Sequence, residues 1–530
     1  MTQMQNNQSD QGGTCGAGCG CGHGAGDGAN GQGDGHNHLS GHELLFPDMP
    51  FKGMKKRIKG AVKDVQLQQF VNDATLKKDV ARTAMMNDTF GPNVLAVKEL
   101  AGSIKQHTLD HLDRYLEQFI ENAEKTGTVV HLAKDAAQAK EIALTIAKQK
   151  GSKLCVKSKS MVTEEVELLD GLESIGVETI ETDLGEFILQ LDGDAPSHIV
   201  TPMIHKNRVS VAKAFTRELG AEYTEDPQAL TTIAREYLRK KFAEADLGMS
   251  GGNFLVAETG GVVICTNEGN GRLSTSVAKT HIAMVGIEKL IPKQEHLGVM
   301  LKVLARSSTG QPLTCYTHIM TGPKREIELD GPEEMHVILV DNGRTNALGA
   351  DTREMLRCIR CGACLNTCPV YRKVGGHSYG AVYPGPIGSI LTPMLRGMDN
   401  YKDMPNASSL CGACYDACPV RINIPKQLIH HRRVMNEQKM NHWFERFVMK
   451  SWTVAYGSKP LYLMSNKMNK VVSRLMSGKK DKGGKYVDHG WSKKMIGPLK
   501  GWTDQKDLMS PPSKSFRQWW NSEHDSKGGK

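Results

Sequence analysis

The sequence predicts an α/β domain with a parallel sheet, followed by a smaller region that is organised around two cysteine runs. Three observations support this prediction. Strand-length apolar segments alternate with segments of helical periodicity over residues 70–345, which is typical of strands joined by right-handed crossovers. Seven cysteines gather within residues 358–368 and 411–418. A composition of 39% hydrophobic and 24% charged residues over 530 residues is ordinary for a globular protein.

The chain before the predicted sheet has the pattern of helices. Residues 44–101 are mostly helical in periodicity, with a break at Gly91 and Pro92, because both residue types interrupt helices. A second amphipathic segment follows. Its apolar residues recur at helical spacing and are most simply core residues: Leu109, Leu112, Leu116, Phe119 and Ile120.

The predicted sheet comes from a repeated change of period. Strands are expected at residues 128–132, 153–157, 177–182, 254–257, 261–266, 282–287 and 335–340. Helices are expected at 135–150 and 162–175, with Asp135 as the N-cap of the first. A further helix should begin at Asp226 and Pro227, which supply a cap and a first-turn proline.

Two polar, glycine-containing regions of this domain are candidates for a ligand site. They comprise residues 181–186 with 201–208, and residues 250–253, 258–261 and 266–272. Glycine lets backbone N–H groups approach an anion, so one interpretation is a carboxylate or phosphate site between strand ends. The candidate residues of this anion or substrate loop are Gly260, Gly261, Asn267 and Glu268. Tight turns with polar caps explain the pattern equally well, because it matches neither a Walker loop nor a dinucleotide fingerprint.

The first cysteine run has the spacing that surrounds a cubane iron-sulfur cluster. Two residues separate Cys358 from Cys361 and Cys361 from Cys364, and Cys368 follows directly before Pro369. Three thiolates on one tight loop can reach three irons of one cube, while the fourth cysteine points toward a second cube. The spacing therefore predicts that the two runs exchange their last cysteines.

The second run repeats this spacing but is one cysteine shorter, since Ser408 stands where the first cysteine would fall. We expect two 4Fe-4S clusters, the first held by Cys358, Cys361, Cys364 and Cys418, and the second by Cys368, Cys411 and Cys414. The second cluster is one thiolate short. It uses a non-cysteine ligand, for which Ser408 is the candidate, leaves one iron open to water or a partner, or is a 3Fe-4S form.

A zinc site and a disulfide framework fit the clustered cysteines less well. Structural zinc usually takes two pairs of ligands, whereas one loop here carries three cysteines and a fourth before proline. A disulfide framework is expected in secreted domains, and residues 1–10 have neither region of a secretory signal. No apolar run approaches the roughly 18 residues of a membrane span. We therefore expect a cytoplasmic protein.

The remaining cysteines and one histidine are less specific candidates. Cys155, Cys265 and Cys315 lie in strand-like or apolar surroundings and are expected to be buried small hydrophobes. His377 lies in the glycine- and proline-rich loop 374–388 between the two runs. It is either a loop hydrogen-bonder, which we favour, or a ligand to the incomplete cluster.

The start of the chain is expected to be disordered, because residues 11–35 contain twelve glycines and cannot build a core. The same stretch offers side chains for a soft or borderline metal, although their spacing matches no closed site: Cys15, Cys19, Cys21 and His23.

The net charge of +9 is concentrated at the other end. Residues 431–530 carry 21 Lys and Arg against 8 Asp and Glu, and the aromatic residues of 443–456 lie on or near one helical face. The basic tail suits an acidic partner or the inner face of an anionic membrane, and a merely solvated extension explains it equally well. The aromatic helix either packs on the cluster domain or a partner subunit, which we favour, or lies on a membrane surface. No recognition motif supports nucleic acid.

Together these motifs resemble the lactate utilisation iron-sulfur protein family, LutB or LldF. The resemblance covers about residues 50–520 and omits the glycine-rich start. It rests on the first cysteine run to Tyr371, Tyr383-Pro-Gly-Pro-Ile-Gly, Leu410-Cys-Gly-Ala-Cys, Pro498-Leu-Lys-Gly-Trp-Thr-Asp, Asp183-Leu-Gly-Glu, Pro196-Ser-His-Ile, Ile204-His-Lys and Glu258-Thr-Gly-Gly. In that family the seven cysteines of the two runs are the cluster ligands.

The resemblance implies a lactate-utilisation (LUD) domain similar to the NagB/RpiA/CoA-transferase-like fold, then an α-helical ferredoxin domain. The expected divisions are a disordered start at 1–45, the LUD domain with N-terminal helices at 46–345, the two-cluster domain at 346–435 and a basic extension with an amphipathic helix at 436–530.

The resemblance also implies a part in the oxidation of L-lactate to pyruvate, with a cysteine-rich partner subunit and a smaller LUD-type subunit. Since the chain has no flavin or nicotinamide fingerprint, we expect an electron-transfer subunit and not the catalyst alone. One alternative is a ligand-binding α/β module whose clusters sense redox state or only stabilise the fold. Another is an electron-transfer subunit for a different hydroxy acid.

Overall fold

The computed structural model describes residues 50–477, 491, 492, 506, 508, 509 and 515–524. All of them belong to one of the two units of the chain, Ser40–Lys530. The glycine-rich start, with Cys15, Cys19, Cys21 and His23, lies outside the described residues, and so does most of the chain after 477.

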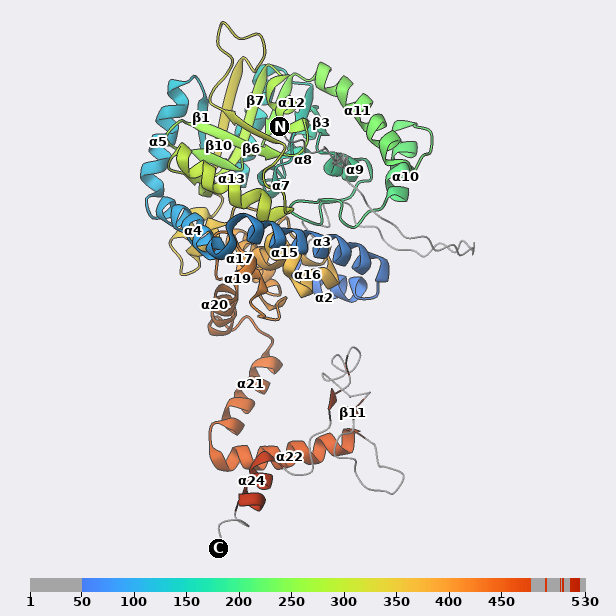
Figure 1. The fold of residues 1–530 in the computed structure, drawn as a ribbon, viewed down its shortest axis with the longest axis vertical. Helices are drawn as coiled ribbons and strands as arrows, with labels where there is room; N and C mark the ends of the chain where they lie inside the picture. Colours follow the sequence, from blue (N-terminus) through green and yellow to red (C-terminus); the bar gives the residue numbers. More distant parts are fainter. Residues whose placement is uncertain (1–49, 478–490, 493–505, 507, 510–514, 525–530) are drawn as a thin grey trace, which may run out of the picture. The chain divides into compact units, whose positions relative to one another are not determined.

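The helical start is confirmed for residues 50–125 (Figure 1). Helices α2 (Pro50–Ala61), α3 (Val65–Phe90), α4 (Val94–Asp110) and α5 (Leu112–Lys125) precede the first strand. The 3-10 turn η1 (Gly91–Asn93) separates α3 from α4, at the predicted break. Asp64 begins α3, because its carboxylate accepts a hydrogen bond from the Leu67 N–H at 2.9 Å.

The central sheet is parallel throughout, with the strand order β1-β10-β7-β4-β2-β3. Its strands are β1 (Val129–Ala133), β2 (Leu154–Lys157), β3 (Glu178–Glu181), β4 (Leu247–Ser250), β7 (Thr280–Gly286) and β10 (Glu334–Val340). All were predicted except β4, which is only four residues long and contains Gly248, so its strand pattern is weak. The predicted parallel sheet is thus confirmed.

Both faces of the central sheet are covered over its inner strands, as is usual for parallel strands, while the edge strand β1 is partly exposed. Ile282 and Met284 of β7 pack into the core under α6 (Ala136–Lys150) and α8 (Leu168–Ser174). The alternate residues Ala283 and Val285 pack into the opposite core with Phe119 of α5. The helices α9 (Leu184–Leu191), α10 (Arg208–Leu219) and α11 (Pro227–Glu244) cover β2 and β3.

The predicted helix at 162–175 is wrong in one respect, because the segment forms α7 (Met161–Glu165) and α8 instead of one helix. Glu167 adopts a left-handed conformation with φ 54°, which interrupts the helical hydrogen bonds. The predicted caps are confirmed elsewhere: Asp135 accepts from the Gln138 N–H, and Asp226 accepts from the Ala229 N–H.

Four further strands form a second sheet, separate from the predicted parallel one. Its strands are β5 (Phe254–Val256), β6 (Gly261–Thr266), β8 (Leu290–Ile291) and β9 (Tyr316–Met320), in the order β8-β5-β6-β9. β6 is antiparallel to both β5 and β9. The four residues between β5 and β6 are too few for a parallel crossover, which needs about ten or more.

The cysteine runs share one core with the N-terminal helices and the second sheet. This core contains Val71 of α3, Phe254 of β5, Leu304 of α13 (Gln294–Ser308) and Tyr371. The short elements here are α12 (Asn270–Ser276), η2 (Ile287–Lys289), α14 (Arg344–Leu348), η3 (Arg353–Arg357), α15 (Ala363–Thr367), α16 (Pro369–Val374), η4 (His377–Tyr379), α17 (Gly385–Arg396), α18 (Met398–Tyr401), η5 (Met404–Asn406) and α19 (Ala413–Ala417).

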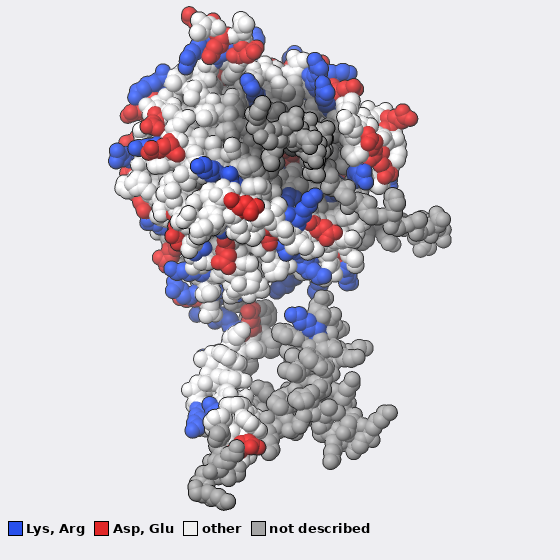
Figure 2. Space-filling model, in the orientation of Figure 1, with Lys and Arg blue, Asp and Glu red and all other residues white. Residues whose placement is uncertain are grey.

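The C-terminal helices are far more exposed. They are α20 (Ile424–Glu437), α21 (Trp443–Tyr456), α22 (Lys459–Ser477) and α24 (Phe516–His524), with the short strands β11 (Trp491–Ser492) and β12 (Leu508–Met509). No residue of α21 is buried, and Trp443, Phe447 and Trp452 each expose more than half of their surface. Figure 2 shows few charged side chains over α21, whereas both signs of charge are interspersed over the rest of that face. None of the described helices combines the length and apolarity of a membrane span.

Candidate metal centre and adjoining pocket

The two cysteine runs fold as two copies of one backbone motif. In each copy a glycine with positive φ, Gly362 at 75° or Gly412 at 86°, begins a short helix, α15 or α19. The two helices contact each other, and each ends at a cysteine in extended conformation, Cys368 or Cys418. Glycine suits both starts, because most side chains are strained in the left-handed region.

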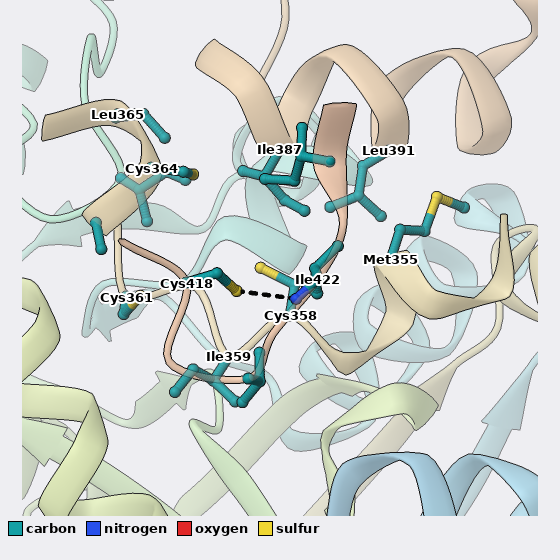
Figure 3. Packing of buried hydrophobic residues seen from close by; sticks show 14 of the residues in the cluster. Met355, Cys358, Ile359, Cys361, Cys364, Leu365, Ile387, Leu391, Cys418 and Ile422 are labelled. Atoms are coloured by element: carbon teal, nitrogen blue, oxygen red, sulfur yellow. Dashed lines mark hydrogen bonds between the residues drawn. The ribbon is translucent and has the colours of Figure 1, made fainter. Parts of the chain in front are cut away.

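Four cysteine side chains line one apolar cavity (Figure 3). They belong to Cys358, Cys361, Cys364 and Cys418, and all four residues are buried. Burial raises the pKa of the Cys361 thiol to about 12 and that of Cys418 to about 11. These groups would therefore be neutral thiols at pH 7 unless a metal displaced the proton, and thiolates are the usual ligands of iron-sulfur clusters.

The other three cysteines of the runs form a second group. Burial, followed by the charges of Cys368 and Cys411, raises the pKa of Cys414 to about 12. The charge of Cys411 likewise raises the pKa of Cys368, so these three thiols interact electrostatically. Cys368 and Cys414 are buried, whereas Cys411 is exposed. The sulfurs are therefore grouped in the exchanged pattern, with Cys418 beside the first run.

Ser408 occupies in the second run the place that Cys358 occupies in the first. Arg360 has φ 59° and its N–H donates to Cys358 Sγ at 3.4 Å. Leu410 has φ 56° and its N–H donates to Ser408 Oγ at 3.1 Å. The same backbone turn thus holds the serine oxygen where the first run holds a cysteine sulfur.

Backbone N–H groups reach several of the sulfurs. Besides the contact to Cys358, Tyr371 N–H donates to Cys368 Sγ at 3.5 Å, and Ile422 N–H donates to Cys418 Sγ at 3.3 Å, the dashed line in Figure 3. Such donors stabilise negative charge on sulfur. Each group of cysteines therefore lies in a setting that favours thiolate once metal is bound.

A pocket of about 280 Å³ lies beside the first cysteine group. Its walls come from the segments that follow β2, β4 and β6, from α13 and from the first cysteine run. The carboxyl ends of β2 and β4 lie side by side in the central sheet, and ligands commonly bind at this edge of parallel sheets. Ile199, Arg360 and Cys361 line both the pocket and the cavity of the four cysteines.

Only two of the four residues of the predicted anion loop lie at the pocket. Asn267 and Glu268 line the pocket. Gly260 and Gly261 do not; Gly260 ends the turn between β5 and β6 and Gly261 begins β6, and a Cβ on Gly260 would lie 2.2 Å from the Ala123 nitrogen of α5. The tight-turn interpretation is correct for these two glycines.

The other candidate region, residues 181–186 with 201–208, also lies only partly at the pocket. Asp183 lines the pocket and caps α9. Glu181 instead pairs with buried Lys157 at 2.6 Å. Lys206 and His205 bind Asp194 at 2.7 and 3.0 Å, which is structural pairing outside the pocket.

A network of buried charges lies between the pocket and Cys358. Glu288 accepts from Arg344 Nε at 2.5 Å and from Arg360 Nη2 at 3.2 Å. Burial opposes ionisation of Glu288, but the charges of Arg344 and Arg360 outweigh it and lower its pKa to about 2. Arg344 also holds both oxygens of Glu165 at 2.9 Å, and the Tyr383 hydroxyl donates to Glu165 at 2.6 Å.

The pocket also carries groups that titrate in unusual ranges. Burial and the charge of Arg360 lower the pKa of Lys289 to about 8. Burial and the neighbouring Asp183 raise the pKa of Glu268 to about 7, although the Leu184 N–H donates to its carboxylate at 3.2 Å. Both side chains can therefore change protonation near neutral pH.

Sequence patterns did not single out Arg360, Glu288 or Lys289. Arg360 lies inside the first cysteine run, and Glu288-Lys289 is a charged pair within an otherwise apolar stretch. A charged residue inside an apolar or cysteine-rich stretch indicates a buried ion pair, because charged side chains are rarely buried without a partner. The partner itself, about seventy residues away in the chain, is visible only in the fold.

The three isolated cysteines and His377 differ in how well they match their predictions. Cys155 is fully buried as expected, Cys265 is half-buried at the pocket, and Cys315 is exposed, which corrects its predicted burial. Cys315 follows a turn at the edge of β9, so its apolar sequence neighbours do not cover it. His377 contacts the Ala195 carbonyl at 2.8 Å and the His205 ring, as a loop hydrogen-bonder would.

Three family models match the chain in sequence. The LUD domain matches residues 116–340, the 4Fe-4S dicluster domain residues 354–422, and the model described as Lactate utilisation protein B, C-terminal, residues 423–525. The dicluster match assigns iron-sulfur clusters to the region of the two cysteine runs.

Several named relatives are similar over most of the chain. "Lactate utilization protein B" of Shouchella clausii is 45% identical over 476 residues, which is 90% of this chain and 97% of the relative. Proteins of the same name from Bacillus cytotoxicus and Bacillus thuringiensis are 47% identical over 435 and 434 residues, 82% of this chain and 89% of each relative. A crystal structure of a DUF162 family protein from Deinococcus radiodurans covers 43% of this chain and 98% of its own, at 13% identity and a TM-score of 0.25, too low to support a conclusion.

Proposed function

The chain belongs to the lactate utilization protein B family, and we propose that it is the electron-transfer subunit of a complex that oxidises L-lactate to pyruvate. It is an iron-sulfur protein of lactate utilisation with a LUD domain and a dicluster domain. The observation that supports electron transfer is the arrangement of seven cysteines in two groups on contacting loops. Lactate oxidation releases two electrons, whereas a cluster accepts one at a time, so two adjoining clusters suit the reaction.

The ligand assignment follows the two groups of sulfurs. We assign the first 4Fe-4S cluster to Cys358, Cys361, Cys364 and Cys418, and the second to Cys368, Cys411 and Cys414. Ser408 is the proposed fourth ligand of the second cluster, because its oxygen takes the place of the Cys358 sulfur in the repeated turn. A 3Fe-4S form and an iron open to solvent are the alternatives.

When bound, the clusters supply one-electron transfer, and the protein sets the conditions for it. Apolar side chains around the first site exclude water, and the N–H groups of Arg360 and Ile422 stabilise charge on sulfur. Both effects tune the reduction potential of a cluster. Within the second group, Cys411 is exposed, which makes that site the accessible one for an external donor or acceptor.

Electron paramagnetic resonance during turnover tests this function. The protein is reconstituted anaerobically, combined with its partner subunits, and frozen at intervals after L-lactate is added. The clusters should be reduced and reoxidised as lactate is consumed. A static signal during turnover would support the sensing or structural alternative. Lactate oxidation by the purified chain alone, at the rate of the complex, would contradict the proposal that another subunit oxidises lactate.

The proposed partners are a cysteine-rich subunit and a smaller LUD-type subunit, and the exposed apolar residues of α21 support a docking role for this helix. Trp443, Phe447 and Trp452 expose 57–69% of their surface, which is costly unless a partner covers them. Co-elution with the cysteine-rich subunit should weaken in a Phe447→Ser, Trp452→Ser variant and persist in a Lys450→Ser variant. Flotation of the wild-type chain with anionic vesicles, lost in the same double variant, would instead identify peripheral membrane contact.

A further inference from the structure

We propose that the 280 Å³ pocket binds a small 2-hydroxy carboxylate, whose carboxylate group lies on the guanidinium of Arg360 and the ammonium of Lys289. The choice of lactate within this class rests on the proposed function. The site itself rests on four features of the pocket: an unpartnered buried donor, an excess of buried positive charge, an adjoining pair of carboxyl groups and contact with the first cysteine group.

One guanidinium nitrogen of Arg360 has no hydrogen-bond partner in the described structure, although the same guanidinium interacts with Cys358 and Glu288. Its side chain is 9% exposed, its Nη2 binds Glu288, and its guanidinium lies 4.7 Å from the centre of the Tyr383 ring. Nη1 is buried and has no partner among the described residues. A buried guanidinium nitrogen without a partner is costly, and a planar carboxylate is the group that a guanidinium binds best.

Among the carboxylates and basic side chains around this nitrogen, positive charge exceeds negative charge, and the charge of Cys358 offsets part of that excess. The carboxylates of Glu165 and Glu288 face three buried basic side chains within reach of one another: Arg344, Arg360 and Lys289. Lys289 lines the pocket and has no hydrogen bond or ion pair within the part of the chain that the structure describes. An anion in the pocket would compensate this excess, whereas a neutral ligand would leave it in place.

The pocket also has groups suited to the hydroxyl of such an acid. Asp183 and Glu268 line it together, on the turns that follow β3 and β6. They are close enough for Asp183 to raise the pKa of Glu268 to about 7, so one of the pair can accept a proton while the other is protonated. A hydroxyl that donates to one of these carboxylates would distinguish a 2-hydroxy acid from a simple carboxylate.

Contact with the first cysteine group links the pocket to electron transfer. Arg360 and Cys361 line both the pocket and the four-cysteine cavity, so no other layer separates a ligand from that cavity. The volume is at the low end for small-molecule sites and is too small for a dinucleotide. A small acid with a few waters fits it.

Calorimetric titration of the anaerobically reconstituted full chain tests the site, with oxamate, L-lactate, lactamide and inorganic phosphate as probes. Oxamate and L-lactate should bind, and lactamide, which lacks the carboxylate, should not. Arg360→Gln and, separately, Lys289→Gln should each weaken oxamate binding about tenfold or more. The matched controls Arg353→Gln and Lys293→Gln remove charges from side chains that are 47% and 57% exposed and outside the pocket, and should leave binding unchanged.

Iron and sulfide content, measured on every variant, separates loss of the site from loss of the cluster. Lys289→Gln keeps the test valid if Arg360→Gln disturbs the neighbouring Cys358, because Lys289 is not part of the cysteine loop. Unchanged oxamate affinity in both variants would overturn the site, and so would phosphate that binds more tightly than oxamate. If oxamate binding depends on Arg360 but the clusters do not cycle during lactate turnover, the binding site is supported and the proposed electron transfer is rejected.

Discussion

At the scale of single residues, local spacing predicts the cysteines and fails for the charges beside them. The seven cysteines are recognisable because their spacing within each run is set by one tight loop. Local spacing cannot predict the ion pair of Arg360 and Glu288, since this contact at 3.2 Å joins segments that are far apart in the chain. Asn267 and Glu268, which follow a strand end, line the pocket, and their part in binding an anion stays a prediction.

Ser408 is the residue whose substitution is most informative about the second cluster. A Ser408→Cys variant places a sulfur in the turn that already matches the one around Cys358. We expect the paramagnetic signal of the second cluster to change and that of the first to stay the same, because Cys358, Cys361, Cys364 and Cys418 are untouched. The control is Ser409→Cys at the adjacent exposed position. An unchanged spectrum would indicate that Ser408 does not reach that cluster.

The buried His281 should make the free energy of unfolding depend on pH. Burial lowers the pKa of this histidine to about 3 from an ordinary value near 6.5, and its Nε2 contacts Ser250 Oγ at 3.0 Å. A histidine that is neutral when folded contributes its full stability above pH 6.5 and loses it as the pH falls toward 3, by up to about 1.4 kcal/mol per pH unit.

Urea unfolding at pH 7.5, 6.5 and 5.5 measures this dependence. The wild-type chain should lose more stability between pH 6.5 and 5.5 than a His281→Gln variant does. His111→Gln, at an exposed position, should retain the wild-type dependence. Equal slopes for wild type and His281→Gln would contradict the assignment.

At the scale of helices and strands, prediction succeeded where the signal is local. The alternation of strands and helices identified five of the six strands of the central sheet, and the caps at Asp135 and Asp226 were correct. The split between α7 and α8 was missed, because the conformation of Glu167 leaves no mark in the apolar pattern. The second sheet was missed since strand pairing depends on contacts between distant segments. The division at residues 345 and 435 stays a prediction.

The turn between β5 and β6 gives a test of this architecture. A Gly260→Ala substitution adds a Cβ where φ is 65° and where the α5 backbone is 2.2 Å away, so it should destabilise the protein by about 2 kcal/mol or more. Gly151→Ala is the matched control, because φ is 62° but no atom lies within 4 Å of its Cβ. That variant should lose only about 1 kcal/mol. Equal losses in chemical denaturation would show that the contact with α5 is not tight.

At the scale of the whole molecule, one hydrophobic core connects the cysteine runs to the α/β domain. It contains six of the seven cysteines, all but the exposed Cys411, together with Leu304 of α13 and Phe254 of β5, whereas the cores on the two faces of the central sheet contain none of the seven. Removal of the metal should therefore loosen part of the α/β domain as well as the cysteine loops.

Hydrogen exchange before and after anaerobic chelation of iron measures this coupling. Exchange should accelerate in α15, α19, α3 and α13, which surround the cysteines, and change little in β7 and β10, which serve as an internal control. Acceleration confined to residues 354–422 would show instead that the dicluster domain is structurally independent.

The repeated cysteine motif has a consequence for how the protein is made in the cell. Each loop gives its last cysteine, Cys368 or Cys418, to the group centred on the other loop. Under the proposed ligand assignment, neither coordination sphere can be completed by one loop alone. A scaffold protein that delivers the first cube must therefore find both loops already synthesised and held together. Neither cluster could then be completed before the second loop is synthesised, and nascent chains that stop before Cys411 would hold no complete cluster.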